Sequence, residues 1–260
     1  MPVILITNDD GIAAEGLKAL FRELSPMAEV YIVAPDRERS ASGRSLTLHK
    51  PLRVQKTGER SFSVSGTPTD CVAVGVEKIL PARPDVVVSG INNGPNLGDD
   101  ITYSGTVSAA MEATVMNIPS LAVSLNVGNG EKAHFATAAR VAASLIHHVL
   151  EHALPFDTLL NVNVPNIPLE EVAGFRLTRH GKRIYEGAIH ETVSPWGEVY
   201  YWIGGGVPYW EHGEDTDIQA VLGGYVSVTP LHLDLTNYKA MDFLRRSWEP
   251  WITRDKGSAW

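Results

Sequence analysis

Near the start of the chain stands the stretch Val3-Ile4-Leu5-Ile6-Thr7-Asn8-Asp9-Asp10-Gly11. Its first five residues are apolar or β-branched, and they predict a strand that is buried on both faces, as in parallel sheets. The carboxylates of Asp9 and Asp10 follow at the end of this strand, where open α/β sheets bind their ligands. Gly11 then permits a sharp turn into a helix predicted over residues 16–24, whose apolar spacing fits packing on the sheet.

The two adjacent carboxylates have two interpretations. Asp9 and Asp10 are hard oxygen ligands, suited to Mg²⁺, Mn²⁺ or Ca²⁺. Asn and Asp are equally common in turns and at the N-terminal caps of helices. The motif by itself leaves both interpretations open, and the rest of the chain must decide between them.

Strand-like and helix-like runs alternate through the first two-thirds of the chain. Further strands are predicted over residues 30–35, 84–90, 121–125 and 159–164. Helices are predicted over residues 69–80, capped by Thr69 or Asp70, and over residues 104–117 and 132–152. This alternation predicts an α/β fold with three Rossmann-like layers, in which a mostly parallel sheet carries helices on both faces.

The pattern changes after about Pro165. Residues 176–185, 199–203 and 225–230 are predicted strands, and residues 237–248 are a predicted terminal helix. We therefore expect residues 1–165 to form a Rossmann-like catalytic core. Residues 166–260 are expected to form a C-terminal extension with a β-hairpin arm, a strand that completes the core and a terminal helix. Its exposed aromatic residues predict a contact between subunits.

Composition excludes several classes of protein. The 260 residues carry 22 basic and 30 acidic side chains, a net charge of −8, which argues against a surface for duplex nucleic acid. Cys71 is the only cysteine, so neither an internal disulfide nor a cysteine-rich zinc site is expected. We see no targeting segment and no apolar run long enough for a membrane span, and we expect a cytoplasmic protein.

Three further segments carry polar groups to the same predicted edge of the sheet. The loop over residues 34–44 brings Ser40 and Ser42, either of which offers a hydroxyl to a metal or to a phosphate. Its three arginines pair either with an anion or with neighbouring acids. The loop over residues 89–100 is rich in Gly and Asn, and the carbonyl oxygens of its asparagine side chains suit a hard cation. Ser104 and Thr106 open a helix, where they serve as caps or hold a phosphate.

Together the four segments suit metal-assisted hydrolysis of a phosphate ester. The sequence lacks a P-loop, a Gly-x-Gly-x-x-Gly fingerprint and a Gly-x-Ser-x-Gly elbow. Three alternatives remain: a covalent route through an aspartate nucleophile, a non-catalytic nucleotide sensor on the same fold, and a dinucleotide-dependent oxidoreductase. Adjacent rather than Asp-x-Asp carboxylates favour metal ligation over the covalent route.

The chain strongly resembles the SurE family of bacterial and archaeal survival proteins. The resemblance extends over essentially the whole chain, and the segments that carry it are Ile6-Thr7-Asn8-Asp9-Asp10-Gly11, Ala34-Pro35-Asp36-Arg37-Glu38-Arg39-Ser40, Gly66-Thr67-Pro68-Thr69-Asp70-Cys71, Val88-Ser89-Gly90-Ile91-Asn92, Gly94-Pro95-Asn96-Leu97-Gly98, Ser104-Gly105-Thr106-Val107 and Gly224-Tyr225-Val226-Ser227-Val228-Thr229-Pro230. The resemblance implies a metal-dependent, acid-phosphatase-like phosphomonoesterase, a 5′-nucleotidase acting on nucleoside 5′-monophosphates. Activity on 3′-nucleotides and short polyphosphate is also implied.

The resemblance further implies a set of site residues and partners. It implies that Asp9 and Asp10 are the catalytic residues. The expected ligands of one divalent ion per subunit (Mg²⁺, Mn²⁺ or Ca²⁺) are Asp9, Asp10, Ser40 and Asn92. The expected phosphate-binding or substrate-binding residues are Asn8, Asn96, Ser104, Gly105 and Thr106. A homodimer or homotetramer, built through the C-terminal arm, is the implied assembly.

Overall fold

The computed structural model describes residues 1–39, 43–128, 130–185, 189–203, 208–210 and 213–252. In chain order the helices and strands are β1 (Val3–Thr7), α1 (Glu15–Leu24), β2 (Glu29–Pro35), β3 (Val54–Gly58), β4 (Ser61–Val64), α2 (Pro68–Val74), the π-helical turn η1 (Gly75–Ile79), β5 (Val86–Asn93), the 3₁₀ helix η2 (Gly98–Thr102), α3 (Gly105–Val115), β6 (Ser120–Asn126), α4 (Phe135–His152), β7 (Thr158–Pro165), the 3₁₀ helix η3 (Leu169–Glu171), β8 (Phe175–Leu177), β9 (Arg183–Tyr185), β10 (Ile189–Val193), β11 (Val199–Ile203), β12 (Pro208–Trp210), α5 (Asp217–Leu222), β13 (Val226–His232) and α6 (Tyr238–Ile252).

A nine-stranded sheet runs through the middle of the molecule, in the order β3-β4-β2-β1-β5-β6-β7-β13-β8. The strands from β4 across to β7 are all parallel to their neighbours. β3 is antiparallel to β4, and β13 is antiparallel to β7. The predicted mostly parallel sheet is therefore confirmed.

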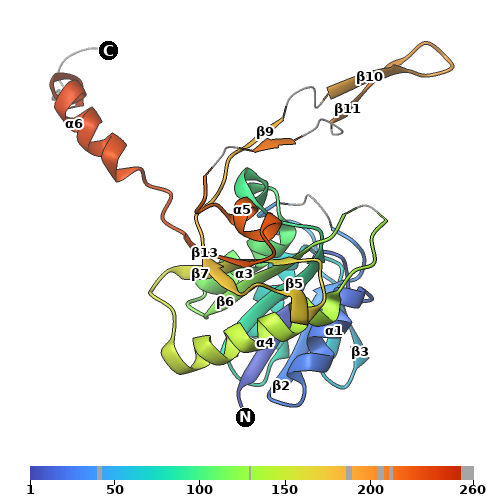
Figure 1. The fold of residues 1–260 in the computed structure, drawn as a ribbon. Helices are drawn as coiled ribbons and strands as arrows, with labels where there is room; N and C mark the ends of the chain where they lie inside the picture. Colours follow the sequence, from blue (N-terminus) through green and yellow to red (C-terminus); the bar gives the residue numbers. More distant parts are fainter. Residues whose placement is uncertain (40–42, 129, 186–188, 204–207, 211–212, 253–260) are drawn as a thin grey trace.

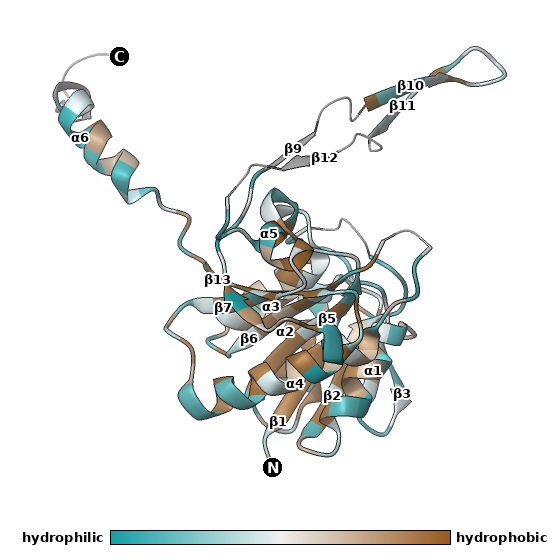
Figure 2. Ribbon diagram, in the orientation of Figure 1, coloured by the Kyte–Doolittle hydropathy of each residue, from teal (hydrophilic) through white to brown (hydrophobic). Residues whose placement is uncertain are grey.

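Helices cover both faces of this sheet, as Figure 1 shows. On one face, Ile6 of β1 packs in a core with Leu20 of α1 and Ile146 of α4. On the other face, Leu5 of β1 packs in a core with Cys71 of α2 and Ala109 of α3. Neighbouring residues of a strand point to opposite faces, so an apolar strand such as β1 contributes to both cores. Figure 2 shows this buried apolar interior, and the predicted three layers are confirmed.

The order of the strands reverses at β1. This strand pairs with β2 on one side, through Ile6 and Ile32, and with β5 on the other, through Ile6 and Val88. Connections leave β1 and β5 in opposite directions, which opens a crevice at the carboxyl ends of these strands. Asp9 follows β1 and Asn92 lies at the end of β5, so both stand at this crevice.

Two predicted elements differ from the structure. The helix expected from residue 69 begins at Pro68 instead, and its cap is Thr67 rather than Thr69 or Asp70. Thr67 Oγ1 accepts from the Asp70 N–H, and the Asp70 carboxylate accepts from the Thr67 N–H. This capping box gives partners to two N–H groups that have no acceptor within the helix. The strand expected over residues 176–185 is two strands, β8 and β9, because the chain leaves the main sheet after Leu177.

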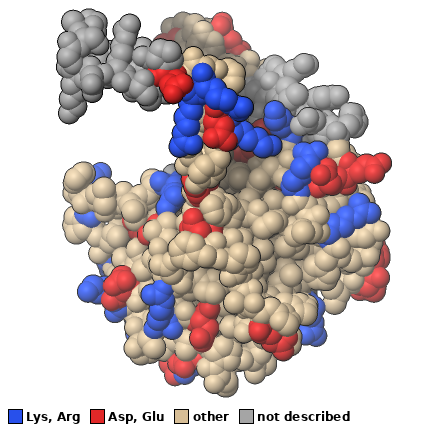
Figure 3. All heavy atoms as spheres, turned by 90° about the vertical axis from the view of Figure 1, so that its left-hand side faces the viewer, with Lys and Arg blue, Asp and Glu red and all other residues tan. Residues whose placement is uncertain are grey.

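The C-terminal part contributes in two ways. β13 and β8 complete the sheet, whereas the β10–β11 hairpin and α6 project away from the body in Figure 1. The hairpin exposes large aromatic side chains, among them Trp196 at 86% and Trp202 at 65%. Of the helices in the described residues, none is long and apolar enough to cross a bilayer. The face drawn in Figure 3 mixes basic with acidic side chains.

Candidate active site

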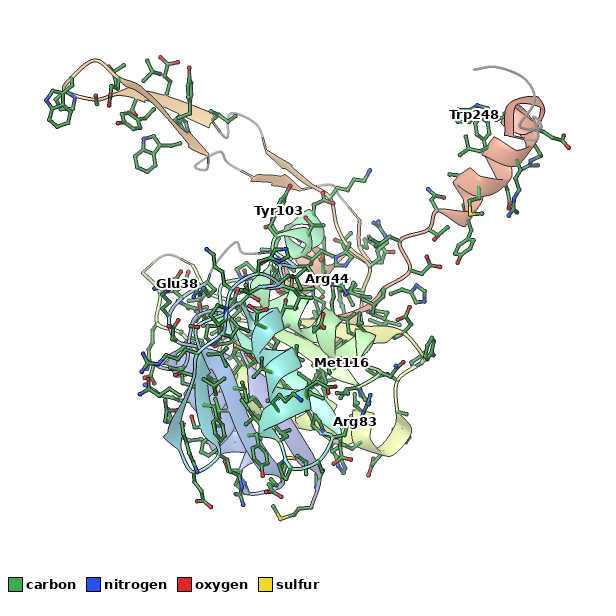
Figure 4. The ribbon with its side chains drawn as sticks, turned by 180° about the vertical axis from the view of Figure 1, so that it is seen from behind. Glu38, Arg44, Arg83, Tyr103, Met116 and Trp248 are labelled. Carbon is green, nitrogen blue, oxygen red and sulfur yellow. The ribbon has the colours of Figure 1, made fainter. Side chains whose placement is uncertain are left out.

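A cavity of about 380 Å³ lies where the carboxyl ends of β1 and β5 meet the N-terminus of α3. The described residues that line it are Asp9, Asp10, Glu38, Asn92, Asn93, Asn96, Asp100, Tyr103 and Ser104. Figure 4 shows Glu38 and Tyr103 at this end of the body, with Met116 and Arg83 toward the other end. The topology therefore brings together segments that are far apart in sequence, as the strand pattern predicted.

Asp9 is held from the N-terminus of α3. Its side chain is only 5% exposed, and its Oδ1 accepts a hydrogen bond of 2.5 Å from the hydroxyl of Thr106. Gly105 is needed for this approach, since a Cβ there would lie 2.8 Å from the Cβ of Asp9. Burial raises the pKa of Asp9, although the Thr106 hydrogen bond opposes the shift.

Asp10 is a second carboxylate, and it is partly buried. Burial raises its pKa to about 6, and the neighbouring charge of Asp9 adds to the shift. The backbone N–H of Asn93 donates to Asp10 Oδ2 at 3.1 Å, which orients this carboxylate toward the end of β5. Two adjacent acids with raised pKa values in one cavity are typical of a functional site.

The chemistry of the cavity wall fits a divalent cation. Asp9, Asp10, Glu38 and Asp100 all line the cavity, so its described lining is rich in carboxylate oxygens. The amide nitrogen of Asn92 donates to Gly94 O at 2.8 Å, which leaves its oxygen as the atom for a cation. Carboxylate and amide oxygens in this combination are ligands of hard metal ions.

Asn96 is held in place by hydrogen bonds to three side chains of the sheet. Its Nδ2 donates to Ser124 Oγ of β6 at 2.7 Å, and its N–H donates to Asn163 Oδ1 of β7 at 2.9 Å. Asn161 and Asn163 both donate to Asn96 O at 2.9 Å. This network anchors the Asn-rich loop on the sheet and holds Asn96 at the cavity.

The structure shows the hydrogen bonds and ion pairs of several predicted site residues whose roles the sequence leaves undecided. Asn8 is fully buried outside the lining, and its side-chain N–H donates to Gly11 O at 3.0 Å, inside the turn after β1. Ser104 caps α3, since its Oγ accepts from Val107 N at 3.1 Å, and it also lines the cavity. Ser40 and Ser42 lie outside the described residues. Arg39 forms an ion pair with Asp36, as the polar-loop interpretation expected.

The cavity is also lined by residues to which the sequence assigns no role. Glu38, Asn93, Asp100 and Tyr103 lie within motifs quoted above or beside them, but no role was assigned to them. The sequence places Asn161 and Asn163 only in a predicted strand. The available signal was their spacing, because two amides at alternate positions of an apolar strand point to one face.

A second group of possible metal ligands lies elsewhere. Among the described residues, His148, Glu151 and His152 hold ligand atoms within 4.8 Å of one another. All three are exposed near the C-terminal end of α4, just before β7 begins. This is the amino end of the parallel strands, opposite to Asp9, so the group does not belong to the cavity.

Comparisons with known proteins identify the family of this chain. The sequence pattern of the family described as Survival protein SurE matches residues 4–187. A protein of Geotalea daltonii named 5′-nucleotidase SurE is 54% identical over 246 residues, which cover 95% of this chain and 98% of that protein. A protein of Geobacter sulfurreducens with the same name is 55% identical over 246 residues, covering 95% and 93%. The crystal structure of SurE protein from Aquifex aeolicus superposes with a TM-score of 0.84, at 45% identity over 94% of this chain and 99% of that one.

Fold and site together define an α/β protein of the doubly wound kind, with an acidic pocket at the switch point of its parallel sheet. A pocket of this composition has oxygen donors for a cation, beside a helix N-terminus that suits an anion. The chain belongs to the SurE family.

Proposed function

We propose that this chain is a divalent-metal-dependent phosphohydrolase that releases phosphate from nucleoside 5′-monophosphates. The name of its relatives, 5′-nucleotidase SurE, supports the reaction and the substrate class. One observation carries the proposal: the adjacent carboxylates of Asp9 and Asp10 line a cavity that also reaches Ser104, the N-terminal cap of α3. Asp9 and Asp10 are hard oxygen ligands beside a helix N-terminus that suits an anion, so the site suits metal-assisted phosphate chemistry.

Asp9, Asp10 and Asn92 are the described residues that would hold the cation, and Ser40 is expected as a fourth ligand. We infer one divalent ion per subunit, of the class of Mg²⁺, Mn²⁺ or Ca²⁺, because all the donors are hard oxygens. A bound cation of this class supplies neutralisation of phosphoryl oxygens and acidification of a water molecule. Thr106 orients Asp9, and the Asn93 N–H orients Asp10.

The phosphate would be held at the wall that the N-terminus of α3 forms, next to Asp9. Ser104 and Asn96 line the cavity there, and the positive end of the α3 dipole points toward it. Asn161 and Asn163 fix the main chain of Asn96, so this wall is already ordered before a substrate arrives. Direct phosphate contacts from Asn8, Gly105 and Thr106 stay predictions.

We also infer that the chain assembles as a homodimer or homotetramer. The support is the projecting β10–β11 hairpin and α6, which expose apolar surface away from the body. On this proposal, residues 1–165 carry the chemistry and residues 166–260 complete the sheet and build the contact between subunits. A cytoplasmic location likewise stays a prediction.

The test is phosphate release from a panel of 5′- and 3′-nucleoside monophosphates and short polyphosphate, with Mg²⁺, Mn²⁺, Ca²⁺ or EDTA. We expect release from the 5′-monophosphates that needs metal and is lost in Asp9→Asn. Asp99→Asn is the matched control, because Asp99 is exposed and lies outside the cavity lining. Nucleotide binding with no release under any metal would instead support the non-catalytic sensor.

A further inference from the structure

We propose that Tyr103 forms the nucleobase subsite of the cavity, by stacking its ring on the base of a nucleoside monophosphate. The inference rests on the proposed nucleotidase function. It adds the part of the site that would distinguish a nucleotide from other phosphate esters, which neither the metal-binding residues nor the phosphate-binding residues can do.

Tyr103 stands at the rim of the cavity. The residue is 70% exposed, although it lines the same cavity as Asp9 and Ser104. Its backbone N–H donates to Asp100 O at 3.0 Å, which fixes the end of the 3₁₀ helix η2 and so the position from which the ring extends. A large exposed ring at a binding cavity still has apolar surface to bury against a ligand.

The other described lining residues have no ring that could stack on a base. Apart from Tyr103 the lining consists of four carboxylates, three asparagine amides and one serine hydroxyl. These groups bind cations, phosphate and hydroxyls, but none of them presents an aromatic plane. Among the described lining residues, Tyr103 alone can therefore stack with a nucleobase.

The order of groups along the cavity matches the order of groups in a nucleotide. Ser104, at the inner end, is 7% exposed and caps α3, where the phosphate is expected. Tyr103 precedes it in the chain and reaches the rim. A ribose separates the phosphate from the base in a nucleotide, so a phosphate at α3 directs the base outward. The cavity volume of about 380 Å³ falls in the range of small-ligand pockets.

Stacking on a single ring also predicts the selectivity. Every base has a π-face, so stacking tolerates all of them, and a purine covers more of the ring than a pyrimidine does. We therefore expect all common bases to be accepted, with purines favoured.

The experiment compares adenosine 5′-monophosphate with ribose 5-phosphate, which keeps the phosphate and sugar but has no base. The full-length, metal-loaded protein is assayed, and the readout is the ratio of the two kcat/KM values. For Tyr103→Ala we expect this ratio to fall by about tenfold or more, which corresponds to the loss of one base–aromatic stack. Tyr103→Phe should keep the ratio, because stacking needs the ring and not the hydroxyl. Phe156→Ala is the matched control: Phe156 is 84% exposed at the amino ends of the strands, away from the cavity.

Two outcomes would overturn the inference while leaving the proposed function intact. In the first, the unmodified protein hydrolyses both substrates with equal kcat/KM. In the second, Tyr103→Ala loses both activities in proportion, which would mean that Tyr103 only supports the loop. If the unmodified protein with metal hydrolysed neither substrate, the proposed function itself would fall.

Discussion

Asp9 and Thr106 are 97 residues apart in sequence and in hydrogen-bond contact in the structure. The contact depends on Gly105, whose missing side chain lets the start of α3 lie against the Asp9 carboxylate. The helix N-terminus therefore has a role that the sequence did not indicate: it positions an acidic side chain of the candidate metal site. Groups that orient a metal ligand in this way strongly affect metal affinity.

Thr106→Val tests this positioning. The substitution keeps the shape of the side chain but removes the hydroxyl that donates to Asp9. We expect metal affinity or kcat/KM to fall by about 10- to 100-fold. Thr106→Ser, which keeps the hydroxyl, is the control, and its metal affinity and kcat/KM should stay close to those of the unmodified protein. Equal metal titrations and rates for Thr106→Val and the unmodified protein would contradict the assignment.

Asp10→Asn should stabilise the protein in EDTA above pH 6. Folding raises the pKa of Asp10 from 3.8 to about 6, chiefly through burial, so ionisation favours the unfolded chain as the pH rises through this window. Near pH 4 the carboxyl is largely neutral in the folded protein and the effect is small. We expect the variant to gain about 1–2 kcal/mol in free energy of unfolding at neutral pH.

Denaturant unfolding in EDTA, at about pH 4 and about pH 7.5, measures this gain. Excess Mn²⁺ should reverse the order of the two proteins, because a cation stabilises only the carboxylate form. An equal gain at both pH values would show that charge burial is not its cause.

At the scale of elements, α5 holds the cavity wall through its first residue. Asp217 is fully buried and accepts from Gly98 N at 2.8 Å and from Gly181 N at 2.9 Å. Gly98 begins η2, which leads to Asp100 and Tyr103. Burial acts to raise the pKa of Asp217, but hydrogen bonds from His180, Gly98 and Gly181 outweigh it, and the net pKa is lowered.

Asp217→Ala should therefore lower the free energy of unfolding by about 2–4 kcal/mol, since it leaves several buried N–H groups without an acceptor. Asp215→Ala is the matched control two residues away. Its side chain is 66% exposed and pairs with Arg179 on the surface, a contact worth about 0–1 kcal/mol. Denaturant unfolding of both variants measures the difference, and equal losses would contradict the role of Asp217.

At the scale of the whole molecule, the projecting β10–β11 hairpin is where we expect the contact between subunits. We expect replacement of residues 189–203 by a short Gly-Ser linker to convert an oligomer into a monomer, because these residues carry the exposed aromatic surface. Molar mass by light scattering measures the change, and Phe156→Ser is a control with an equally exposed aromatic residue elsewhere. A monomeric unmodified protein, or an unchanged mass after removal, would contradict the proposed assembly.

Much of the body could be predicted because its elements have strong local patterns. β1 runs over Val3–Thr7 as expected, since a run of apolar and β-branched residues has few other structures open to it. The cap of α2 was misplaced because Thr67, Thr69 and Asp70 are all good capping residues, and only the hydrogen bonds distinguish them. The sequence does not predict β3 or β4: the edge strand β3 is polar and exposed, and β4 has only four residues, so neither has a clear apolar pattern.

The sequence by itself determined the class of fold, the family and the edge of the sheet where the polar motifs gather. These follow from periodicity and from short motifs, which are local properties of the chain. Only the tertiary structure decided which groups meet: Thr106 with Asp9, Asn163 with Asn96, and Asp217 with Gly98. Those contacts join residues 97, 67 and 119 positions apart, and their geometry depends on how strands and helices pack rather than on any pattern along the chain.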